Sequence, residues 1–331
     1  MNSQISIWKF IKKSFSENIP VMLLYVLESS GSSPGRQGFF MAVNAEKEME
    51  GSIGGGIMEH KFVEMAKEKL QEIRNKEQKI RNEKVTAEIR KQIHDKAAGK
   101  NQSGMICSGA QTIFLYHISE KDIDVVEKLI SSLEQNKNGT LHLSANGILF
   151  ENIAPTKDFD FNLNTDEDWN YSEKTGFKNS LYIIGGGHCA LAFSKLMSTM
   201  DFYIHLFEDR EQLNTVEKNN YANEKTIVKN YSELKESIPS GENNYVVIMT
   251  FGYRTDDIAV RALINKDFKY FGLLGSQKKI EKLFEEYRKG GIAADALKKI
   301  HSPIGIQIKS ETSEEIAVSI AAEIIKVKND R

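Results

Sequence analysis

The chain has 331 residues, with 44 lysines and arginines against 46 aspartates and glutamates, so its formal net charge is −2. This near balance excludes a strongly basic binder of nucleic acid or anionic membrane, because such partners require an unbalanced positive field. The length predicts two domains. Two cysteines are too few for a disulfide framework, and no apolar stretch predicts a signal peptide or a membrane span, so we expect a cytoplasmic protein.

The first half of the chain mixes helical and strand patterns. Ile5, Trp8, Ile11 and Phe15 recur at helical spacing and predict an amphipathic helix. Strands are predicted at 21–27, 39–43 and 111–117, a long helix from about Glu59, and a hairpin around the Asn-Gly pair at 146–147. These elements predict an α+β domain over residues 1–154.

Residues 155–179 are acidic and polar and show no periodicity, so the sequence predicts an interdomain linker there. Beyond them, strands predicted at 181–184, 203–207, 226–228, 245–250 and 270–274 alternate with helical patterns. Such alternation indicates a Rossmann-like, doubly wound parallel sheet over residues 180–331. The predicted fold class is therefore α/β, with an N-terminal α+β domain before this sheet.

The strand at 181–184 runs into a glycine turn and then a helix. Gly185, Gly187 and Ala190 fit a dinucleotide-binding fingerprint, and His188 begins the helix whose N-terminus would face a phosphate. About 20 residues later, Asp209 follows Glu208 at a strand end, where an acid can hold a ribose hydroxyl. The alternative is a tight turn in a nucleotide-free domain, with Asp209 and Arg210 as a structural ion pair.

A further loop follows the strand predicted at 270–274. Gly275 and Ser276 can present N–H and hydroxyl donors to a phosphate, with Lys278 or Lys279 as counter-charge. They can equally well begin the next helix.

The N-terminal half has a glycine turn of its own. Gly54, Gly55 and Gly56 open a helix and predict a second anion site, because helix N-termini expose free N–H groups. Glu59 in the first helical turn can take part in hydrogen bonding there, or simply complement the helix dipole.

Cys107 lies in a turn of small residues with Ser108 and Gly109. An exposed thiol in this position can act as a thiolate or as a soft ligand for a metal or sulfur. The alternative is a buried structural thiol. Cys107 is the candidate metal ligand, since the scattered histidines show no metal-binding spacing.

Several short motifs occur in a distinctive order: GSSP at 31–34, GSIGGG at 51–56, GMICSG at 104–109, GGGH at 185–188, GLLGS at 272–276 and HSPIG at 301–305. Together they resemble the xanthine dehydrogenase accessory factor family (XdhC/CoxI), over nearly the whole chain. Two motifs depart from the family pattern. Cys107-Ser108-Gly109 stands where many relatives have Cys-Gly-Gly, and TFGY at 250–253 stands where many have Thr-His-Asp-His.

The resemblance implies a maturation factor that binds the molybdenum cofactor and supports its sulfuration and insertion into a xanthine dehydrogenase-type molybdenum hydroxylase. That hydroxylase and a cysteine desulfurase are the implied partners, and a homodimer is the expected assembly. The candidate cofactor-binding residues are Gly54, Gly55, Gly56, Glu59, Cys107, Ser108, Gly109, Gly185, Gly187, His188, Asp209, Gly275 and Ser276. No residue is predicted to be catalytic. The Rossmann turn can in addition bind NAD(P) or another adenine nucleotide.

Two other functions fit the same sequence. An NAD(P)-dependent oxidoreductase needs an acid or base near the nicotinamide, for which Tyr253, Arg254 and His301 are the candidates. A nucleotide-sensing regulator would bind nucleotide without turnover.

Overall fold

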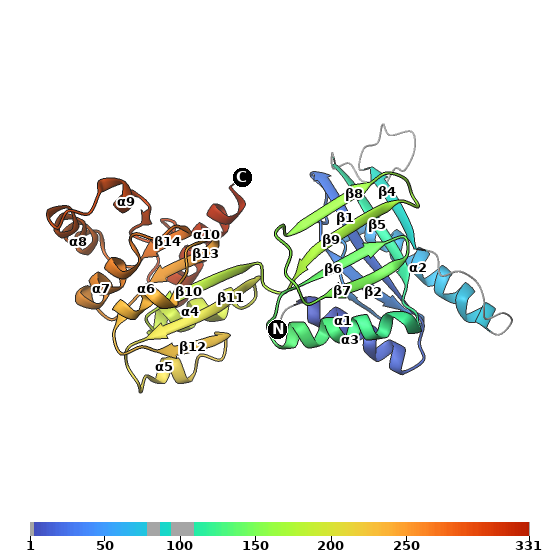
Figure 1. Cartoon of the computed structure of the whole chain (residues 1–331), viewed down its shortest axis with the longest axis horizontal. Coiled ribbons are helices and arrows are strands. Elements are labelled where there is room, and N and C mark those ends of the chain that lie inside the picture. Colours follow the sequence, from blue (N-terminus) through green and yellow to red (C-terminus); the bar gives the residue numbers. More distant parts are fainter. Residues whose placement is uncertain (1–2, 78–86, 94–108, 331) are drawn as a thin grey trace. The chain divides into compact units, whose positions relative to one another are not determined.

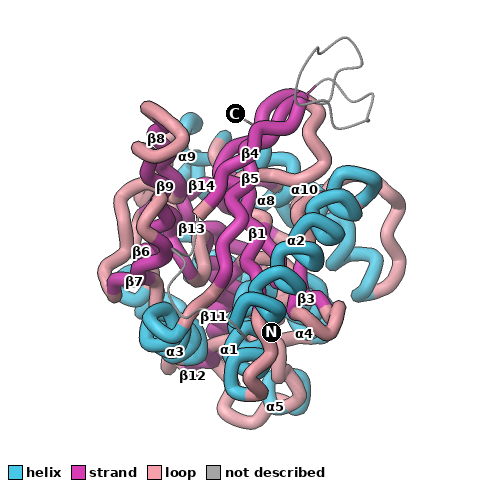
Figure 2. Tube along the Cα trace, turned by 90° about the vertical axis from the view of Figure 1, so that its right-hand side faces the viewer, coloured by secondary structure: helices cyan, strands magenta, loops and turns pink. Residues whose placement is uncertain are grey.

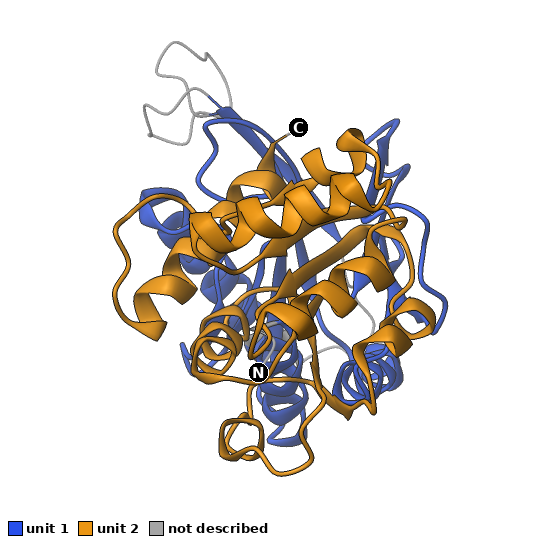
Figure 3. Ribbon diagram, turned by 90° about the vertical axis from the view of Figure 1, so that its left-hand side faces the viewer, with its two compact units in different colours: residues 1–176 blue, residues 177–331 orange. Residues whose placement is uncertain are grey.

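The computed structural model describes residues 3–77, 87–93 and 109–330. The chain divides into two compact units, residues 1–176 and residues 177–331, which Figure 3 shows in different colours. The first unit contains two antiparallel sheets and the second contains one parallel sheet.

The larger sheet of the first unit has five strands in the order β3-β2-β1-β5-β4 (Figure 1). They are β1 (Val21–Gly31), β2 (Phe40–Asn44), β3 (Met49–Gly51), β4 (Glu88–Ile93) and β5 (Gly109–His117). The first seven residues of β1 are all buried, because both faces of this sheet are covered. Helix α2 (Gly56–Glu77) packs on one face through Met58, Phe62 and Leu70.

The opposite face packs against a second core layer. This layer consists of helices α1 (Ser3–Ser16) and α3 (Ile123–Glu134), preceded by the short η1 (Glu120–Asp122), together with a second sheet in the order β7-β6-β9-β8. The four strands are β6 (Gly139–Ser144), β7 (Gly147–Glu151), β8 (Phe159–Leu163) and β9 (Trp169–Thr175). Figure 2 shows strands of the larger sheet running side by side and α2 beside them.

The linker predicted at 155–179 is wrong for most of its length, because β8 and β9 lie within it. Alternate residues of β9 are buried, among them Trp169 and Tyr171, and β9 pairs with both β6 and β8. Polar residues hid this alternation, since Glu173 and Thr175 occupy two of the four buried positions of β9. The first unit therefore ends at Gly176 rather than at residue 154.

The second unit has six parallel strands in the order β12-β11-β10-β13-β14-β15, which confirms the predicted doubly wound sheet. They are β10 (Asn179–Ile184), β11 (Phe202–Glu208), β12 (Glu224–Ile227), β13 (Gly241–Ile248), β14 (Phe268–Leu273) and β15 (Ile300–His301). Counted from β10, this is the strand order 3-2-1-4-5-6 of dinucleotide-binding folds. The order reverses between β10 and β13, where such sheets bind their ligands.

Helices cover both faces of this sheet. Helices α4 (His188–Met197) and α10 (Ser313–Asn329) share one core, and α7 (Tyr253–Leu263) and α8 (Gln277–Lys289) share the other. The shorter elements are α5 (Asn214–Glu217), η2 (Tyr231–Glu233), α6 (Leu234–Ser237) and α9 (Ala294–Lys298). In the described part of the chain, we find no helix with the length and apolar character needed to cross a membrane.

Because β9 is part of the first unit, a stable fragment of this unit must include β9. A fragment of residues 1–176 should unfold cooperatively in urea, whereas a fragment of residues 1–154 should not. The shorter fragment loses the buried Trp169 and Tyr171, and removing one buried aromatic side chain already costs about 3–5 kcal/mol. Circular dichroism during urea titration measures both, and equal unfolding midpoints would show that β8 and β9 are dispensable.

Candidate functional site

The turn after β10 lies where the strand order reverses, and its geometry requires glycine. Gly185 has a φ of +103°, and a Cβ there would lie 2.4 Å from the carbonyl oxygen of Met249. Gly187 is the N-cap of α4. In the part of the chain that the structure describes, no side chain caps this helix, and no atom lies within 4 Å of the place of a Cβ on Gly187. The turn therefore packs closely on β13 at its start and is open at its end, where α4 begins with His188.

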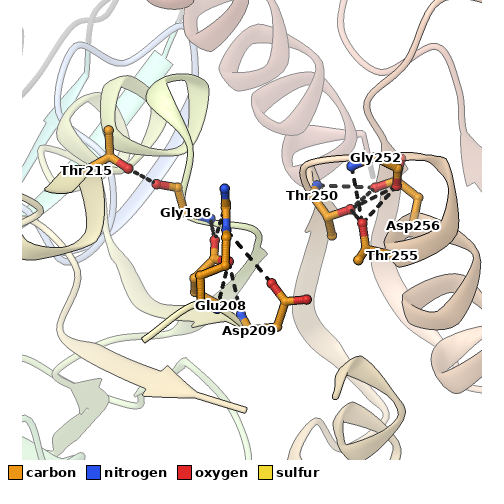
Figure 4. Close-up of polar contacts among 9 residues, drawn as sticks. Gly186, Glu208, Asp209, Thr215, Thr250, Gly252, Thr255 and Asp256 are labelled. Carbon is orange, nitrogen blue, oxygen red and sulfur yellow. Dashed lines mark hydrogen bonds and ion pairs between the residues drawn. The ribbon is translucent and has the colours of Figure 1, made fainter. Parts of the chain in front are cut away.

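The residue that holds this turn is Glu208, which is fully buried at the end of β11. Its carboxylate accepts hydrogen bonds from the backbone N–H of Gly186 at 2.6 Å and from Nε and Nη2 of Arg210 at 2.7 and 2.9 Å. The backbone N–H groups of Asp209 and Arg210 complete the set (Figure 4). Burial raises the pKa of Glu208, but these hydrogen bonds outweigh burial and lower the pKa below its ordinary value.

Asp209, the predicted ribose ligand, is partly exposed beside this carboxylate. Burial, followed by the hydrogen bond and the charge of Glu208, raises the pKa of Asp209. The ion pair predicted between Asp209 and Arg210 has an N–O distance of 4.0 Å, whereas Arg210 approaches Glu208 to 2.7 Å. The main partner of Arg210 is therefore Glu208, which the sequence did not single out.

A cavity of about 560 Å³ opens in front of the turn. Its lining comes from three strand ends: Gly187, His188 and Leu191 after β10, Arg210, Leu213, Asn214, Thr215 and Lys218 after β11, and Met249, Thr250 and Phe251 after β13. Among these residues there are three basic side chains and no acidic one. The cavity thus combines a glycine turn, a helix N-terminus and positive charge, which together suit an anionic ligand.

The loop between β13 and α7 is held by internal hydrogen bonds. The Thr250 hydroxyl donates to Asp256 at 2.6 Å and contacts the Thr255 hydroxyl, and the Asp256 carboxylate also accepts from the Thr250 N–H (Figure 4). Lys279 forms an ion pair with the same buried carboxylate. This network positions Thr250 and Phe251 at the cavity, where Phe251 is 87% exposed.

Gly275 and Ser276 begin helix α8. Ser276 is its N-cap, and its hydroxyl accepts from the backbone N–H of Lys279. The ammonium group of Lys279 is engaged by Asp256, and none of these three residues lines the cavity. Of the two readings of this loop, the structure therefore favours the start of a helix.

In the first unit, three predicted motifs meet at one end of the larger sheet. A Cβ on Gly54 would lie 2.3 Å from the Gly35 nitrogen, and one on Gly109 would lie 2.8 Å from the Ser33 nitrogen. The buried Gln111 amide donates to the carbonyl oxygens of Gly35 at 2.9 Å and Ile53 at 3.3 Å. Loop 31–36, turn 52–56 and the start of β5 therefore contact one another through their backbones.

The turn at 52–56 is closed by Glu59. One oxygen of its carboxylate accepts from the Ser52 hydroxyl at 2.6 Å and from the N–H groups of Ile53 and Gly55 at 2.9 and 3.0 Å. The Gly54 N–H donates to the Ser52 hydroxyl at 3.0 Å. The prediction that the N–H groups of Gly54 and Gly55 face an external anion is thus wrong, because Glu59 and Ser52 accept from them.

Gly55 and Gly56 still leave an open surface. Both have positive φ, of +75° and +70°, and no atom of the described residues lies within 4 Å of the place of a Cβ on either. Cys107 and Ser108 lie outside the described residues, whereas Gly109 pairs with Gly31 at the start of β5. In the described ranges no three His, Cys, Asp or Glu side chains form a group that could hold a metal ion.

Several residues of these sites escaped the sequence analysis. Glu208 was considered only together with Asp209, and Gln111, Lys218 and Phe251 were given no role. Their spacing carries no motif, since Gln111, Glu208 and Phe251 contact residues 22 to 76 positions away in the sequence. A polar residue inside a strand pattern, as Gln111 is, was the one available signal.

Because the Glu59 carboxylate accepts hydrogen bonds from the turn at 52–56, its replacement should lower the stability of the folded protein. Glu59→Ala should lower the free energy of unfolding by about 1–3 kcal/mol, because it leaves N–H donors without their acceptor. Glu59→Gln should cost less, since its amide oxygen can still accept. Urea unfolding measures both, with the exposed Glu68→Ala on the same helix as control. An Ala effect no larger than the control would contradict this role.

The lowered pKa of Glu208 predicts a pH dependence. Its ionised form stabilises the folded state fully above the ordinary value of 4.5, and this contribution is lost as the pH falls towards the lower folded pKa. Glu208→Gln removes this ionisable group. Below about pH 5, the free energy of unfolding of the variant should therefore change less with pH than that of the wild type. Urea unfolding over a pH series measures this, with the exposed Glu211→Gln as control. Identical pH slopes for the wild type and Glu208→Gln would refute the assignment.

Similarity to known proteins supports the same division of the chain. Residues 181–324 match the family model of the XdhC Rossmann domain, and residues 15–80 match that of the XdhC and CoxI family. The chain is 24% identical over 319 residues to the uncharacterized protein YqeB of Escherichia coli. The matched region covers 95% of this chain and 44% of YqeB. The chain is 33% identical over 82 residues to a probable xanthine dehydrogenase subunit of Bacillus subtilis, covering 25% and 23% respectively.

The chain therefore spans less than half the length of these curated relatives. A crystal structure described as a xanthine dehydrogenase from Bacillus halodurans superposes with a TM-score of 0.68, at 19% identity, and covers 98% of this chain and 96% of that one. This likeness concerns the fold. The two family models together match more than half of the residues, in the order in which the two units occur, and the chain belongs to the XdhC and CoxI family.

Proposed function

We propose that the chain is an accessory factor that binds the molybdenum cofactor and supports its sulfuration and its insertion into a xanthine dehydrogenase-type molybdenum hydroxylase. The observation that carries the proposal is the meeting of loop 31–36, turn 52–56 and Gly109 in the first unit. In the sequence, Cys107 precedes Gly109 by two residues.

The described residues suit such a cargo in shape. Among the described residues, no atom lies within 4 Å of a Cβ built on Gly55 or Gly56, which leaves room for a flat ring system next to the backbone there. When bound, the cofactor would supply the metal and its sulfido ligand. Cys107 would act as its soft ligand, whereas Glu59 would hold the turn in shape rather than bind the phosphate.

The relatives support a link to xanthine dehydrogenase. The Bacillus subtilis relative is named as a probable component of that enzyme, and the Bacillus halodurans structure carries the same enzyme name. In this proposal the client hydroxylase and a cysteine desulfurase are the partners, and the chain works as a homodimer.

The second unit adds a site for an adenine nucleotide such as NAD(P), in the cavity at the switch point of its sheet. Gly187 and His188 lie at its phosphate-binding end. The oxidoreductase alternative receives less support, because Tyr253, Arg254 and His301 are not among the described residues that line the cavity. His301 instead contacts Glu323 and stacks on Tyr270.

The proposal is tested by producing the chain together with the cofactor pathway and measuring bound molybdenum, pterin and adenine nucleotide after purification. Molybdenum and pterin should co-purify in equal amounts. Cys107→Ala should retain less than about a tenth of both, as the loss of a metal or metal-orienting ligand typically costs 10–100-fold in affinity.

Cys189→Ala is the matched control, because this second cysteine is partly buried in the core of the other unit. It should retain its molybdenum and pterin. If wild-type protein carries neither, the proposed function fails; if both variants retain the cargo equally, Cys107 is not its ligand.

A further inference from the structure

The end of β11 is the place where a dinucleotide-binding fold recognises the adenosine ribose. An acid there selects an unmodified ribose by accepting its hydroxyl groups, which requires free acceptor positions on its carboxylate. Glu208 is fully buried and already accepts from five N–H groups of Gly186, Asp209 and Arg210. Asp209 is not among the residues lining the cavity. The described lining of the cavity therefore offers an unphosphorylated ribose no carboxylate.

Arg210 takes the place that such an acid would have. Its guanidinium lines the cavity and is oriented by two hydrogen bonds to Glu208, which use two of its five N–H donors. The ring of Phe251 lies 5.4 Å from its central carbon. With its orientation restricted on two sides, Arg210 has lost part of the side-chain entropy that binding would otherwise remove.

The charge around Arg210 favours an anion. Lys218 and His188 line the same cavity, and no described residue lining it is acidic. Two carboxylates lie close to Arg210: Glu208 is buried and paired with it, and Asp209 approaches it to 4.0 Å but does not line the cavity. A phosphate entering the cavity therefore meets Arg210 and Lys218, and no acidic side chain among the described lining residues.

We propose that this cavity prefers a nucleotide with a phosphate monoester on its adenosine ribose, NADP over NAD, and that Arg210 pairs with this phosphate. The inference rests on the nucleotide site proposed above and names its ligand. Glu208 acts here as a positioning residue, because it holds the guanidinium without touching the ligand. Arg210 is the specificity-determining residue.

Isothermal titration calorimetry of the full chain with NADP⁺ and with NAD⁺ tests the preference. NADP⁺ should bind at least about tenfold more tightly, a difference of about 1.4 kcal/mol, since hydrogen bonds to charged groups are stronger than those between neutral groups. Adenosine 2′,5′-bisphosphate should likewise bind more tightly than adenosine 5′-monophosphate. Equal or tighter binding of NAD⁺, or no binding of either dinucleotide, would overturn the inference without any variant.

Arg210→Gln should reduce the preference for NADP⁺ over NAD⁺ to about threefold or less, because the charge that pairs with the phosphate is lost. Arg288→Gln is the matched control, because Arg288 is exposed in the last turn of α8 and lies outside the cavity lining. The preference of Arg288→Gln for NADP⁺ over NAD⁺ should equal that of the wild type. Thermal unfolding checks that Arg210→Gln is folded, and an unchanged preference in the folded variant would remove Arg210 from the recognition.

The same preparations separate this inference from the proposed function. Protein that carries molybdenum and pterin but does not prefer NADP⁺ supports the accessory role and refutes the inference. Protein that prefers NADP⁺ but carries no cargo supports the inference and refutes the accessory role.

Discussion

In each unit, a glutamate of the chain itself holds a glycine-rich turn in place. Glu59 binds the turn before α2, and Glu208 binds the turn between β10 and α4. Backbone N–H groups in such turns point inward and need acceptors, since leaving them unpaired costs more than a hydrogen bond gains. A carboxylate supplies several acceptor positions at once, which lets a short, strained segment keep one shape.

The two turns differ in what they leave open. In the first unit, Glu59 and Ser52 accept from three successive N–H groups, so the turn presents bare backbone surface rather than donors. In the second unit, Gly186 is the residue of the turn whose N–H donates to Glu208, and the end of the turn at Gly187 faces a cavity lined by basic side chains. This difference is why we assign a flat, sulfur-rich cargo to the first site and a phosphate-bearing nucleotide to the second.

Arg210 connects structure and ligand recognition in the second unit. It neutralises the buried Glu208 and at the same time faces the cavity. The pair thus stabilises the turn and sets the sign of the charge at the ribose end. The three charged residues at the end of β11, Glu208, Asp209 and Arg210, therefore have different roles. Their order in the chain does not reveal which of them holds the turn and which faces the ligand.

The sequence by itself determined the Rossmann-like unit, its glycine turn and the family, because these depend on local patterns: alternating strands and helices, glycines at fixed spacing, and motifs in a fixed order. It did not reveal β8, which has no fully buried residue, or β9, in which Glu173 and Thr175 hold two of the four buried positions. Only the tertiary structure decided which donors are already used, since Gln111, Glu59 and Glu208 act on backbone groups 4 to 76 residues away. Hydrogen-bond partners are set by packing in three dimensions, and spacing along the chain does not encode them.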